Sequence, residues 1–180
     1  MTGTEPTTAG QRLSFGVDVG GSGVKGGVVD LDTGLLVGER YKVLTPQPAT
    51  PAAIAETVAE VVEHFGWTGP LGVTYPGVVV NGVVQTAANV DKSWIGTDAD
   101  DVISAAVGGQ RVSVLNDADA AGLAEEHYGA GRDKTGVIVL LTFGTGIGSA
   151  VIHNGVLLPN TEFGHLEVGD LAVVVATGAV

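Results

Sequence analysis

Two segments near the start of the chain alternate β-branched residues with glycine, at residues 13–19 and 24–30. Such alternation predicts strands, and the intervening residues 20–23 include three glycines, which favours a tight turn. A second turn signal, Asp-Thr-Gly at 32–34, precedes a third strand-like segment at 35–44. The pattern therefore predicts an antiparallel meander.

A helical pattern follows the meander. Thr50 supplies an N-cap and Pro51 occupies the first helical position, where proline is favoured. Apolar residues then recur on one helical face until Gly66, at Ile54, Val58, Val61, Val62 and Phe65. Two further helices are expected at residues 98–107 and 117–128.

The remaining apolar segments are short and predict strands and hairpins. These are residues 71–74, the Asn-Gly hairpin at 78–84, 112–115, 137–143, 149–152, and 156–158 after a second Asn-Gly turn. Hairpins mixed with strand–helix alternation predict an α/β fold in which helices pack on a mixed sheet. Residues 1–12 are rich in Thr, Gly and Pro without periodicity, so we expect a disordered tail there.

Composition narrows the classes of partner. The chain has 20 acidic and 8 basic residues and a net charge of −12, so nucleic acid and anionic membranes would repel it and neither is expected as a partner. The absence of cysteine excludes disulfides and thiolate zinc sites. No stretch approaches the ~20 apolar residues of a membrane span. The N-terminal residues do not have the pattern of a targeting signal, so we expect a cytoplasmic protein.

The first glycine turn formally satisfies G-x-G-x-x-G, through Gly21, Gly23 and Gly26. A dinucleotide-binding fingerprint requires a helix directly after the glycines, whereas the next residues here are rich in glycine and valine, which make a poor helix. A Walker-type loop is excluded as well, because Lys25 is followed by glycine. What remains is a strand–turn–strand whose backbone N–H groups can close on phosphate, with Asp18 placed to hold Mg²⁺ through its water shell. The alternative is a plain hairpin with surplus glycine.

A second turn of the same design lies at residues 144–148, with hydroxyls at Thr142 and Thr145. Two such turns on separate hairpins could hold different phosphates of one polyphosphate chain. The candidate phosphate-binding residues are therefore Asp18, Gly20, Gly21, Ser22, Gly23, Lys25, Gly144, Thr145, Gly146 and Gly148.

Asn116 and Asp117 stand where a buried strand is expected to meet a helix. A carboxylate there can act as general base on a sugar hydroxyl, and the neighbouring amide can hold a second hydroxyl. The alternative is that Asp117 is an ordinary helix N-cap. We expect Asp119, one turn into the helix, to be a surface acid that compensates the helix dipole.

A polar segment near the end of the sequence gathers Glu162, His165 and Glu167. These side chains can hydrogen-bond the vicinal hydroxyls of a sugar. His and carboxylates are also metal ligands, but no fourth ligand is evident nearby in the sequence, so sugar contact is the preferred interpretation.

Residues 89–94 form a polar segment with one large aromatic residue, Trp94. A ligand-facing loop has this composition, and a sugar ring could pack against the indole. The alternative is a Trp that anchors a loop onto the core.

Four motifs together resemble those of the ROK (repressor, open reading frame, kinase) sugar kinases of the actin-like ATPase superfamily. They are DVGGSGVK at 18–25, LNDADAA at 115–121, TFGTGIG at 142–148 and EFGH at 162–165. The wider context, LTPQPATP at 44–51 and TAANVDKSWIG at 86–96, resembles the actinobacterial polyphosphate glucokinases within that family.

The resemblance implies an actin-like ATPase (ribonuclease H-like) fold and phosphoryl transfer from inorganic polyphosphate or ATP to the 6-hydroxyl of glucose with Mg²⁺. By matching motif positions, Asp117 would be the catalytic base and the two glycine turns would bind phosphate. The sugar contacts would be Asn89, Asn116, Glu162, His165 and Glu167. For the full-length family, the resemblance implies a homodimer. Many relatives carry a cysteine-rich zinc motif, and the resemblance does not imply zinc for this chain.

The resemblance covers residues 15–169, and we interpret residues 13–169 as the first lobe of such a kinase and the start of its second lobe. Members continue into the rest of that lobe, whereas here an atypical tail at 170–180 follows. Two hypotheses follow: a glucokinase, or an inactive or sugar-binding-only fragment of one. The family's transcriptional repressors are disfavoured, because no helix-turn-helix or basic segment precedes Leu13.

Overall fold

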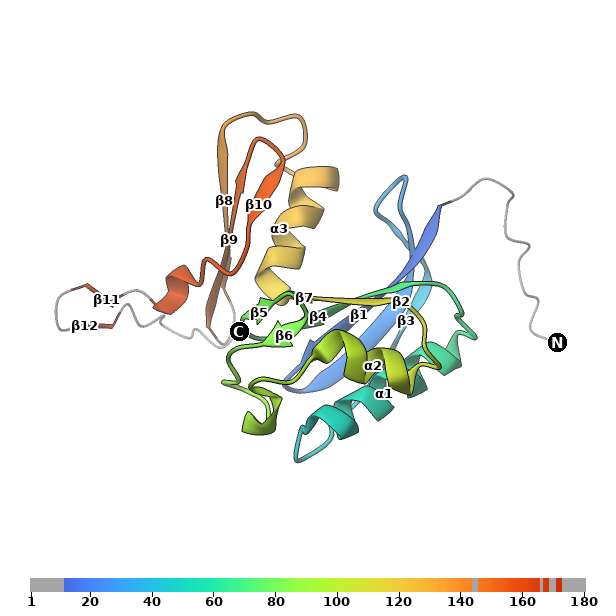
Figure 1. Cartoon of the computed structure of the whole chain (residues 1–180). Coiled ribbons are helices and arrows are strands. Elements are labelled where there is room, and N and C mark those ends of the chain that lie inside the picture. Colours follow the sequence, from blue (N-terminus) through green and yellow to red (C-terminus); the bar gives the residue numbers. More distant parts are fainter. Residues whose placement is uncertain (1–11, 144–145, 166, 169–170, 173–180) are drawn as a thin grey trace.

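The structure is a computed structural model that describes residues 12–143, 146–165, 167–168 and 171–172. The segment 1–12, apart from Arg12, and the tail 170–180, apart from β12 (Leu171–Ala172), lie outside these residues. Figure 1 shows a first sheet with two helices, followed by a third helix and a second, smaller sheet. In the part of the chain described, no helix is long and apolar enough to cross a membrane.

A five-stranded sheet organises the first part of the chain, in the order β3-β2-β1-β4-β7. Its strands are β1 (Leu13–Gly20), β2 (Gly23–Asp30), β3 (Leu36–Val43), β4 (Leu71–Tyr75) and β7 (Val112–Asn116). The first three strands form the predicted antiparallel meander, and β4 and β7 run parallel to β1. The predicted mixed sheet is confirmed, and the carboxyl ends of its three parallel strands meet at one end of the sheet.

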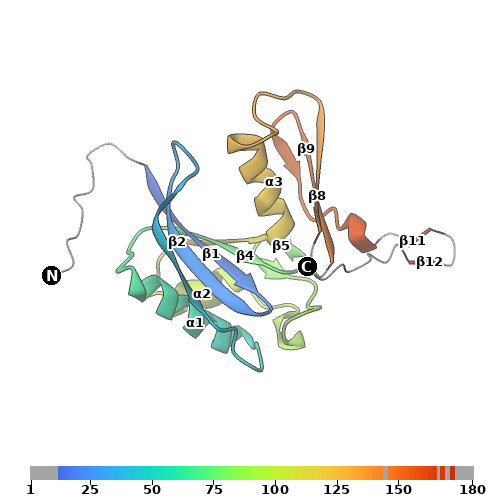
Figure 2. The same ribbon diagram turned by 180° about the vertical axis from the view of Figure 1, so that it is seen from behind.

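Two helices, α1 (Pro51–His64) and α2 (Ala99–Ala106), cover one face of this sheet (Figures 1 and 2). α1 begins where the sequence predicts, because the side chain of its N-cap Thr50 accepts a hydrogen bond from Ala53 N (3.3 Å). The apolar stripe of α1 is completely buried against the sheet, with no exposure at Ile54, Val58 and Val61. This burial supplies the main hydrophobic contribution to holding the helix on the sheet.

A small hairpin follows β4, formed by β5 (Val79–Val80) and β6 (Val83–Val84). Its turn residues Asn81 and Gly82 have φ of 51° and 80°, the left-handed conformation that Asn-Gly turns adopt readily. The predicted Asn-Gly hairpin is therefore confirmed, and it lies beside the carboxyl end of β7.

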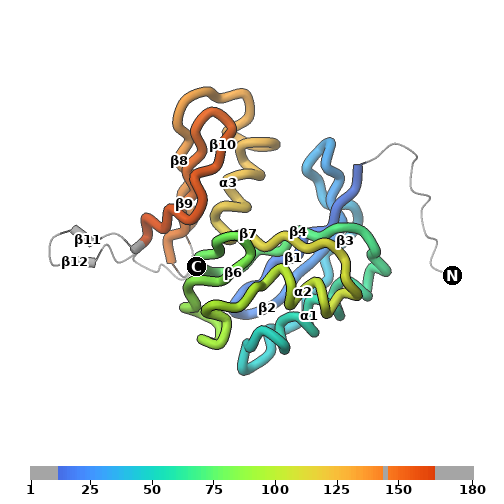
Figure 3. Tube along the Cα trace, in the orientation of Figure 1, coloured from blue at the N-terminus to red at the C-terminus, as the bar shows by residue number. Residues whose placement is uncertain are grey.

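The chain then passes into a second unit, traced in Figure 3. It consists of α3 (Asp117–Tyr128) and a sheet of β8 (Val137–Phe143), β9 (Ile147–His153) and β10 (Val156–Leu158) in the order β10-β9-β8. This antiparallel meander repeats the β3-β2-β1 arrangement of the first sheet. Gly122 lets α3 pack closely, because a Cβ there would collide with the side chain of Ala150. Past β10 come η2 (Phe163–His165), β11 (Glu167–Val168) and β12.

The face of the second sheet that points away from α3 is apolar and exposed. Alternate residues of β8 form most of it, with exposures of 66% at Val137, 53% at Val139, 45% at Leu141 and 73% at Phe143. Two residues of β10 extend the patch, Val156 at 64% and Leu158 at 49%. A contiguous apolar face of this kind is an interaction surface or an aggregation liability.

We expect the chain to self-associate through this face, so Val139→Ser combined with Leu141→Ser should shift it toward monomer. Light scattering during size-exclusion chromatography over a range of concentrations measures the effect. Leu35→Ser with Leu44→Ser is the matched control, since those two side chains are 68% and 76% exposed on the first unit. A wild-type chain that stays monomeric at every concentration would contradict the prediction.

Candidate active site

The carboxyl ends of β1 and β4 bring three polar side chains together. Asp18 lies opposite Lys25 of β2 on one side and opposite Thr74 of β4 on the other. Its carboxylate accepts a hydrogen bond from Thr74 Oγ1 (2.9 Å) and pairs with Lys25 Nζ at 3.2 Å. The Asp18 side chain is 50% exposed, and an ion pair at such a surface contributes only about 0–1 kcal/mol. Lys25 can therefore exchange this partner for an anionic ligand at little cost.

The first glycine turn is the two-residue connection between β1 and β2 that the sequence predicts. Gly20 and Gly23 pair across its base, and Thr45 Oγ1 donates a hydrogen bond to Gly20 O (2.5 Å). A Cβ on Gly23 would displace the flexible end of the Lys42 side chain and would lie close to the backbone carbonyl of Val43. At Gly21 a Cβ would meet nothing within 4 Å, so this side of the turn is open to a ligand. Phosphate binding by the turn stays a prediction.

The second glycine turn is described only in part, because Gly144 and Thr145 lie outside the described residues. Gly146 faces open space, whereas a Cβ on Gly148 would meet Thr142 Oγ1 and the Ala118 side chain. The strand end at Gly148 thus packs directly on the first turn of α3. This contact brings the second hairpin beside Asp117.

Asn116 joins the first sheet to α3 and is 5% exposed. It is the N-cap of the helix, and its Oδ1 accepts hydrogen bonds from the backbone N–H groups of Ala118 (2.9 Å) and Asp119 (3.0 Å). Its Nδ2 donates to Gly77 O (3.1 Å) and to Glu162 Oε1 (3.1 Å). The cap is therefore Asn116, which excludes the ordinary N-cap interpretation of its neighbour.

Asp117 is the first residue of α3 and its side chain is exposed next to this cap. Loss of hydration against the surrounding protein raises its pKa, the hydrogen bond from Ala118 N (2.8 Å) lowers it, and the negative charge of Asp18 raises it further. The influence of Asp18 shows that the end of β1 and the start of α3 lie within electrostatic reach. A carboxylate with a raised pKa in an open site is suited to accept a proton.

Glu162 is brought to Asn116 from 46 residues away, as the sugar interpretation requires. Its backbone has φ of 43°, in the left-handed region that non-glycine residues rarely adopt. His165 and Glu167 follow in η2 and β11, and their side chains lie outside the described residues. The structure thus unites two of the predicted sugar contacts, Asn116 and Glu162, with Asp117.

Within the described residues, no hydrogen bond joins Asn89 or Trp94 to this cluster. Asn89 is exposed in the loop after β6. Trp94, in η1 (Lys92–Trp94), is completely buried and its Nε1 donates to Ala49 O (3.0 Å). The indole therefore anchors the loop onto the core, as the second interpretation of this segment holds, and sugar contact by Asn89 stays a prediction.

The prediction for Asp119 was wrong. The side chain is 1% exposed and its Oδ2 accepts a hydrogen bond from Asn160 N (2.7 Å). Burial raises its pKa, and the charge of Asp117 adds to this. Sequence reasoning also missed Thr74 and Asn160. Once the register of β4 on β1 is known, it places Thr74 beside Asp18. No local sequence pattern indicates a role for Asn160.

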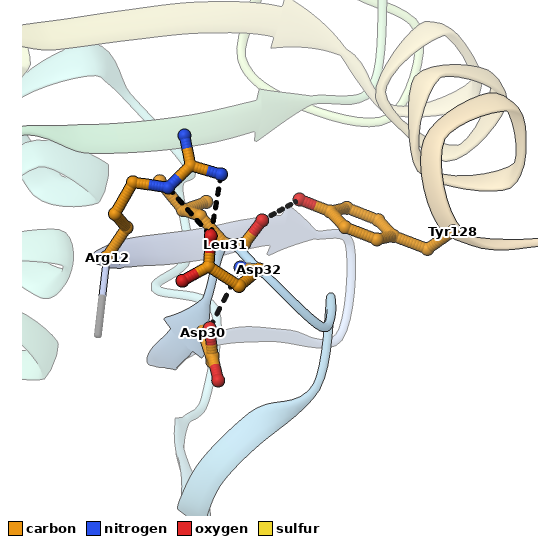
Figure 4. Close-up of polar contacts among 5 residues, drawn as sticks. All are labelled: Arg12, Asp30, Leu31, Asp32 and Tyr128. Carbon is orange, nitrogen blue, oxygen red and sulfur yellow. Dashed lines mark hydrogen bonds and ion pairs between the residues drawn. The ribbon is translucent and has the colours of Figure 1, made fainter. Parts of the chain in front are cut away.

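A cavity of about 640 Å³ extends from Asp18 along the face of the first sheet that α1 and α2 leave uncovered. Its walls are mainly apolar or glycine, with Lys25 and Thr74 at the end near Asp18 and Tyr128 of α3 among its other lining residues. Tyr128 Oη donates to Leu31 O (2.8 Å), which ties the last turn of α3 to the β2–β3 turn (Figure 4).

The same turn is stabilised by local polar contacts, which Figure 4 also shows. Arg12 pairs with Asp32 at 2.7 Å, and Asp32 N donates to Asp30 Oδ1 (2.8 Å). Gly34 lies against the Tyr128 ring, where a Cβ would collide with the ring. The two ends of α3 are thus attached to the first sheet, through Asn116 and through Tyr128.

A family model described as "ROK family" matches residues 14–178. The chain belongs to the ROK family. It is 71% identical to polyphosphate glucokinase of Mycobacterium tuberculosis, over 94% of this chain and 66% of that protein. The expected similarity to the polyphosphate glucokinases of this family is thereby confirmed.

Solved ROK structures agree with the fold. The chain superimposes with a TM-score of 0.85 on the inorganic polyphosphate/ATP-glucomannokinase of an Arthrobacter species, with 51% identity over 90% of this chain and 66% of that one. A ROK glucokinase of Streptomyces griseus, solved with glucose and AMPPNP, gives a TM-score of 0.76 and 32% identity over 93% of this chain and 55% of that one. The actin-like kinase fold is confirmed, and the chain spans about two thirds or less of each of these proteins.

Asp117 should make the stability of the chain depend on pH. Because its folded-state pKa is raised, the folded protein holds the proton more tightly than the unfolded chain, and stability is lost as pH rises through the raised value. The thermal midpoint of wild type minus that of Asp117→Asn should therefore decrease as the pH is raised from 4 to 8. Asp133→Asn, at a side chain 94% exposed, should show no such trend. A difference that is constant across this range would contradict the assigned pKa direction.

Proposed function

We propose that this ROK protein is a glucokinase that transfers a phosphoryl group from inorganic polyphosphate or ATP to the 6-hydroxyl of glucose. The observation that carries the proposal is the position of Asp117, an exposed carboxylate of raised pKa that directly follows Asn116, the partner of Glu162, and lies within electrostatic reach of Asp18. The polyphosphate glucokinase and glucomannokinase relatives named above support the donor and the sugar.

In this mechanism Asp117 is the general base. The raised pKa gives this carboxylate greater basicity toward the hydroxyl proton. Asn116 and Glu162 hold other sugar hydroxyls, together with Asn89, His165 and Glu167 from the motif match. Fixing the sugar in this way orients the 6-hydroxyl toward the donor phosphate, which accounts for much of the catalysis of phosphoryl transfer.

The donor phosphates bind between the two glycine turns in this proposal. The open side of Gly21 admits a phosphate to the backbone N–H groups of Gly21, Ser22 and Gly23, and Lys25 adds a positive charge. Gly144, Thr145, Gly146 and Gly148 form the opposing turn. The eight basic residues of the sequence make no evident track for a long polyanion, so the assignment of polyphosphate is supported by the relatives.

Asp18 fits the expected role toward Mg²⁺. Magnesium keeps most of its water shell and takes one or two carboxylates, and Asp18 is a single, half-exposed carboxylate fixed by Thr74 beside the phosphate turn. Bound there through water, the ion would neutralise charge on the transferring phosphoryl group. The described residues contain no cluster of three His, Asp or Glu side chains suited to a protein-enclosed metal.

The chain spans 66% of the length of its mycobacterial relative, and the second candidate is a chain that binds sugar without transferring phosphate. The proposed partners are glucose for both candidates and, for the kinase, a polyphosphate or ATP donor, with a homodimer and a cytoplasmic location expected for the full-length family. Glucose, Mg²⁺ and either donor should yield glucose 6-phosphate, detected with a coupled dehydrogenase. Binding of glucose by calorimetry without any product would select the second candidate.

Replacement of the base separates chemistry from binding. Asp117→Asn should lower kcat by roughly 10²-fold or more, because a general base contributes about 10²–10⁴-fold, while the affinity for glucose changes little. Asp133→Asn serves as the control acid. A variant at position 117 that retains the full rate would exclude this residue as the base.

Substitution of the open glycine tests the phosphate turn. Gly21→Val should leave the thermal midpoint near that of wild type, since no atom lies within 4 Å of a Cβ there and the backbone has no positive φ. The new side chain should occupy the space of the donor and raise its KM roughly tenfold, without changing glucose affinity. Gly21→Ala should have a smaller effect of the same sign. Unchanged donor KM in both variants would show that phosphate binds elsewhere.

A further inference from the structure

The segment 160–162 carries Glu162 to the site without belonging to a helix or strand. We propose that Asp119 and Asn160 are positioning residues, which set Glu162 against Asn116 and thereby determine how tightly the chain binds its sugar. The inference rests on the proposed function, because it takes glucose as the ligand of Glu162. It adds two residues that no sequence motif marked for this role.

Asp119 provides the first attachment, from the first turn of α3. Its Oδ2 accepts a 2.7 Å hydrogen bond from the backbone N–H of Asn160, in a setting where only 1% of the residue is exposed. Its Oδ1 is buried and accepts no hydrogen bond from the described residues. A carboxylate costs free energy to bury in this way, whereas an acid serving only the helix dipole would face solvent. Among the described residues, the hydrogen bond from Asn160 N is the polar contact of this carboxylate that can offset that cost.

Asn160 provides the second attachment, through its own side chain. Its Nδ2 donates to Val79 O (2.9 Å) and its Oδ1 accepts from Val79 N (3.1 Å), so the amide pairs with β5 as a neighbouring strand would. Its φ of 58° lies in the left-handed region, which Asn adopts more readily than most residues. The hairpin that Asn160 binds begins shortly after Gly77, whose carbonyl accepts a hydrogen bond from Asn116 Nδ2. Both partners of the Asn116–Glu162 pair are therefore fixed to the same short stretch of chain.

Ser149 of β9 holds the other side of the segment. Its carbonyl accepts from Thr161 Oγ1 (3.1 Å) and its Oγ accepts from Phe163 N (2.8 Å). The residues immediately before and after Glu162 are thus tied to β9, while Asn160 is tied to α3 and β5. Three elements from distant parts of the sequence converge on this segment.

These attachments explain how Glu162 keeps its backbone conformation. A φ of 43° is unfavourable for a residue with a Cβ, and such a conformation persists only when the surroundings enforce it. If the attachments at Asp119 and Asn160 are removed, Glu162 can relax to an ordinary φ. Its carboxylate then leaves Asn116, and the sugar site loses its preformed geometry.

Calorimetric titration of the 180-residue chain with glucose tests the proposal. Asn160→Gly keeps the left-handed φ but removes the side chain, and Asp119→Ala removes the acceptor, so both should raise the Kd roughly tenfold. Asp119→Asn retains an acceptor for Asn160 N and should bind more nearly like wild type. Asn154→Gly is the matched control, because Asn154 also has a left-handed φ (49°) and accepts from Gly136 N (2.7 Å) far from the site. Its Kd should match that of wild type.

A merely structural role would give a different result. Partial unfolding lowers the fitted number of sites and leaves the Kd of the folded molecules unchanged, whereas a positioning role raises the Kd itself. In a Glu162→Gln background, Asn160→Gly should add little further loss, because both changes act through the same carboxylate. Additive effects, or a Kd unchanged in both Asn160→Gly and Asp119→Ala, would overturn the inference. A wild-type chain that binds no glucose overturns the proposed function and this inference with it.

Discussion

The side-chain amide of Asn116 is the contact on which the arrangement of the site depends. Its oxygen caps α3, and its nitrogen donates to Gly77 O and to Glu162 Oε1. One buried residue therefore fixes the start of the helix, the loop after β4 and the carboxylate of Glu162. Removal of a helix cap alone costs about 1 kcal/mol, and here the same change would also leave the Gly77 carbonyl and the Glu162 carboxylate without this donor.

The first sheet determines what surrounds this contact. Because β1, β4 and β7 are parallel, their carboxyl ends place Asp18, Thr74 and Asn116 along the same end of the sheet. The glycine turn extends from the end of β1, and Gly148 lets the second hairpin approach the start of α3. The proposed phosphate-binding and sugar-binding residues thus become neighbours although they are far apart in the sequence. The repeated meander supplies the two turns, and α3 sets their separation.

Local sequence patterns predicted most elements of the fold. Alternation in β1 and β2, the Thr50-Pro51 start of α1 and the two Asn-Gly turns each depend on neighbours within a few residues, and each was confirmed. The pairing of β4 with β1 and of β7 with β4 could be expected only as a mixed sheet, since register depends on contacts between distant segments. The same limit explains Trp94, whose role is decided by the carbonyl of Ala49.

Asp119 shows the limit most clearly. An acid in the first turn of a helix is typical of a solvent-exposed residue that compensates the dipole, and nothing within the helix distinguishes it from Asp117. The segment that buries it arrives about 40 residues later, held by side-chain bonds and not by a strand pattern. Of two acids with the same local setting, one is covered and the other stays open, and this difference comes entirely from tertiary structure.

The clustering of acids also carries a cost that the fold has to offset. The charges of Asp18 and Asp117 disfavour each other, and Asp117 in turn disfavours the charge of Asp119. Like charges held close in a partly dehydrated site lower stability, and the overall charge of −12 adds to this. The cationic Lys25 relieves the repulsion only around Asp18, so the repulsion between Asp117 and Asp119 is left to be offset by packing and by the hydrogen bond to Asn160. Groups that destabilise the folded chain in this way are characteristic of sites shaped for chemistry and not for stability.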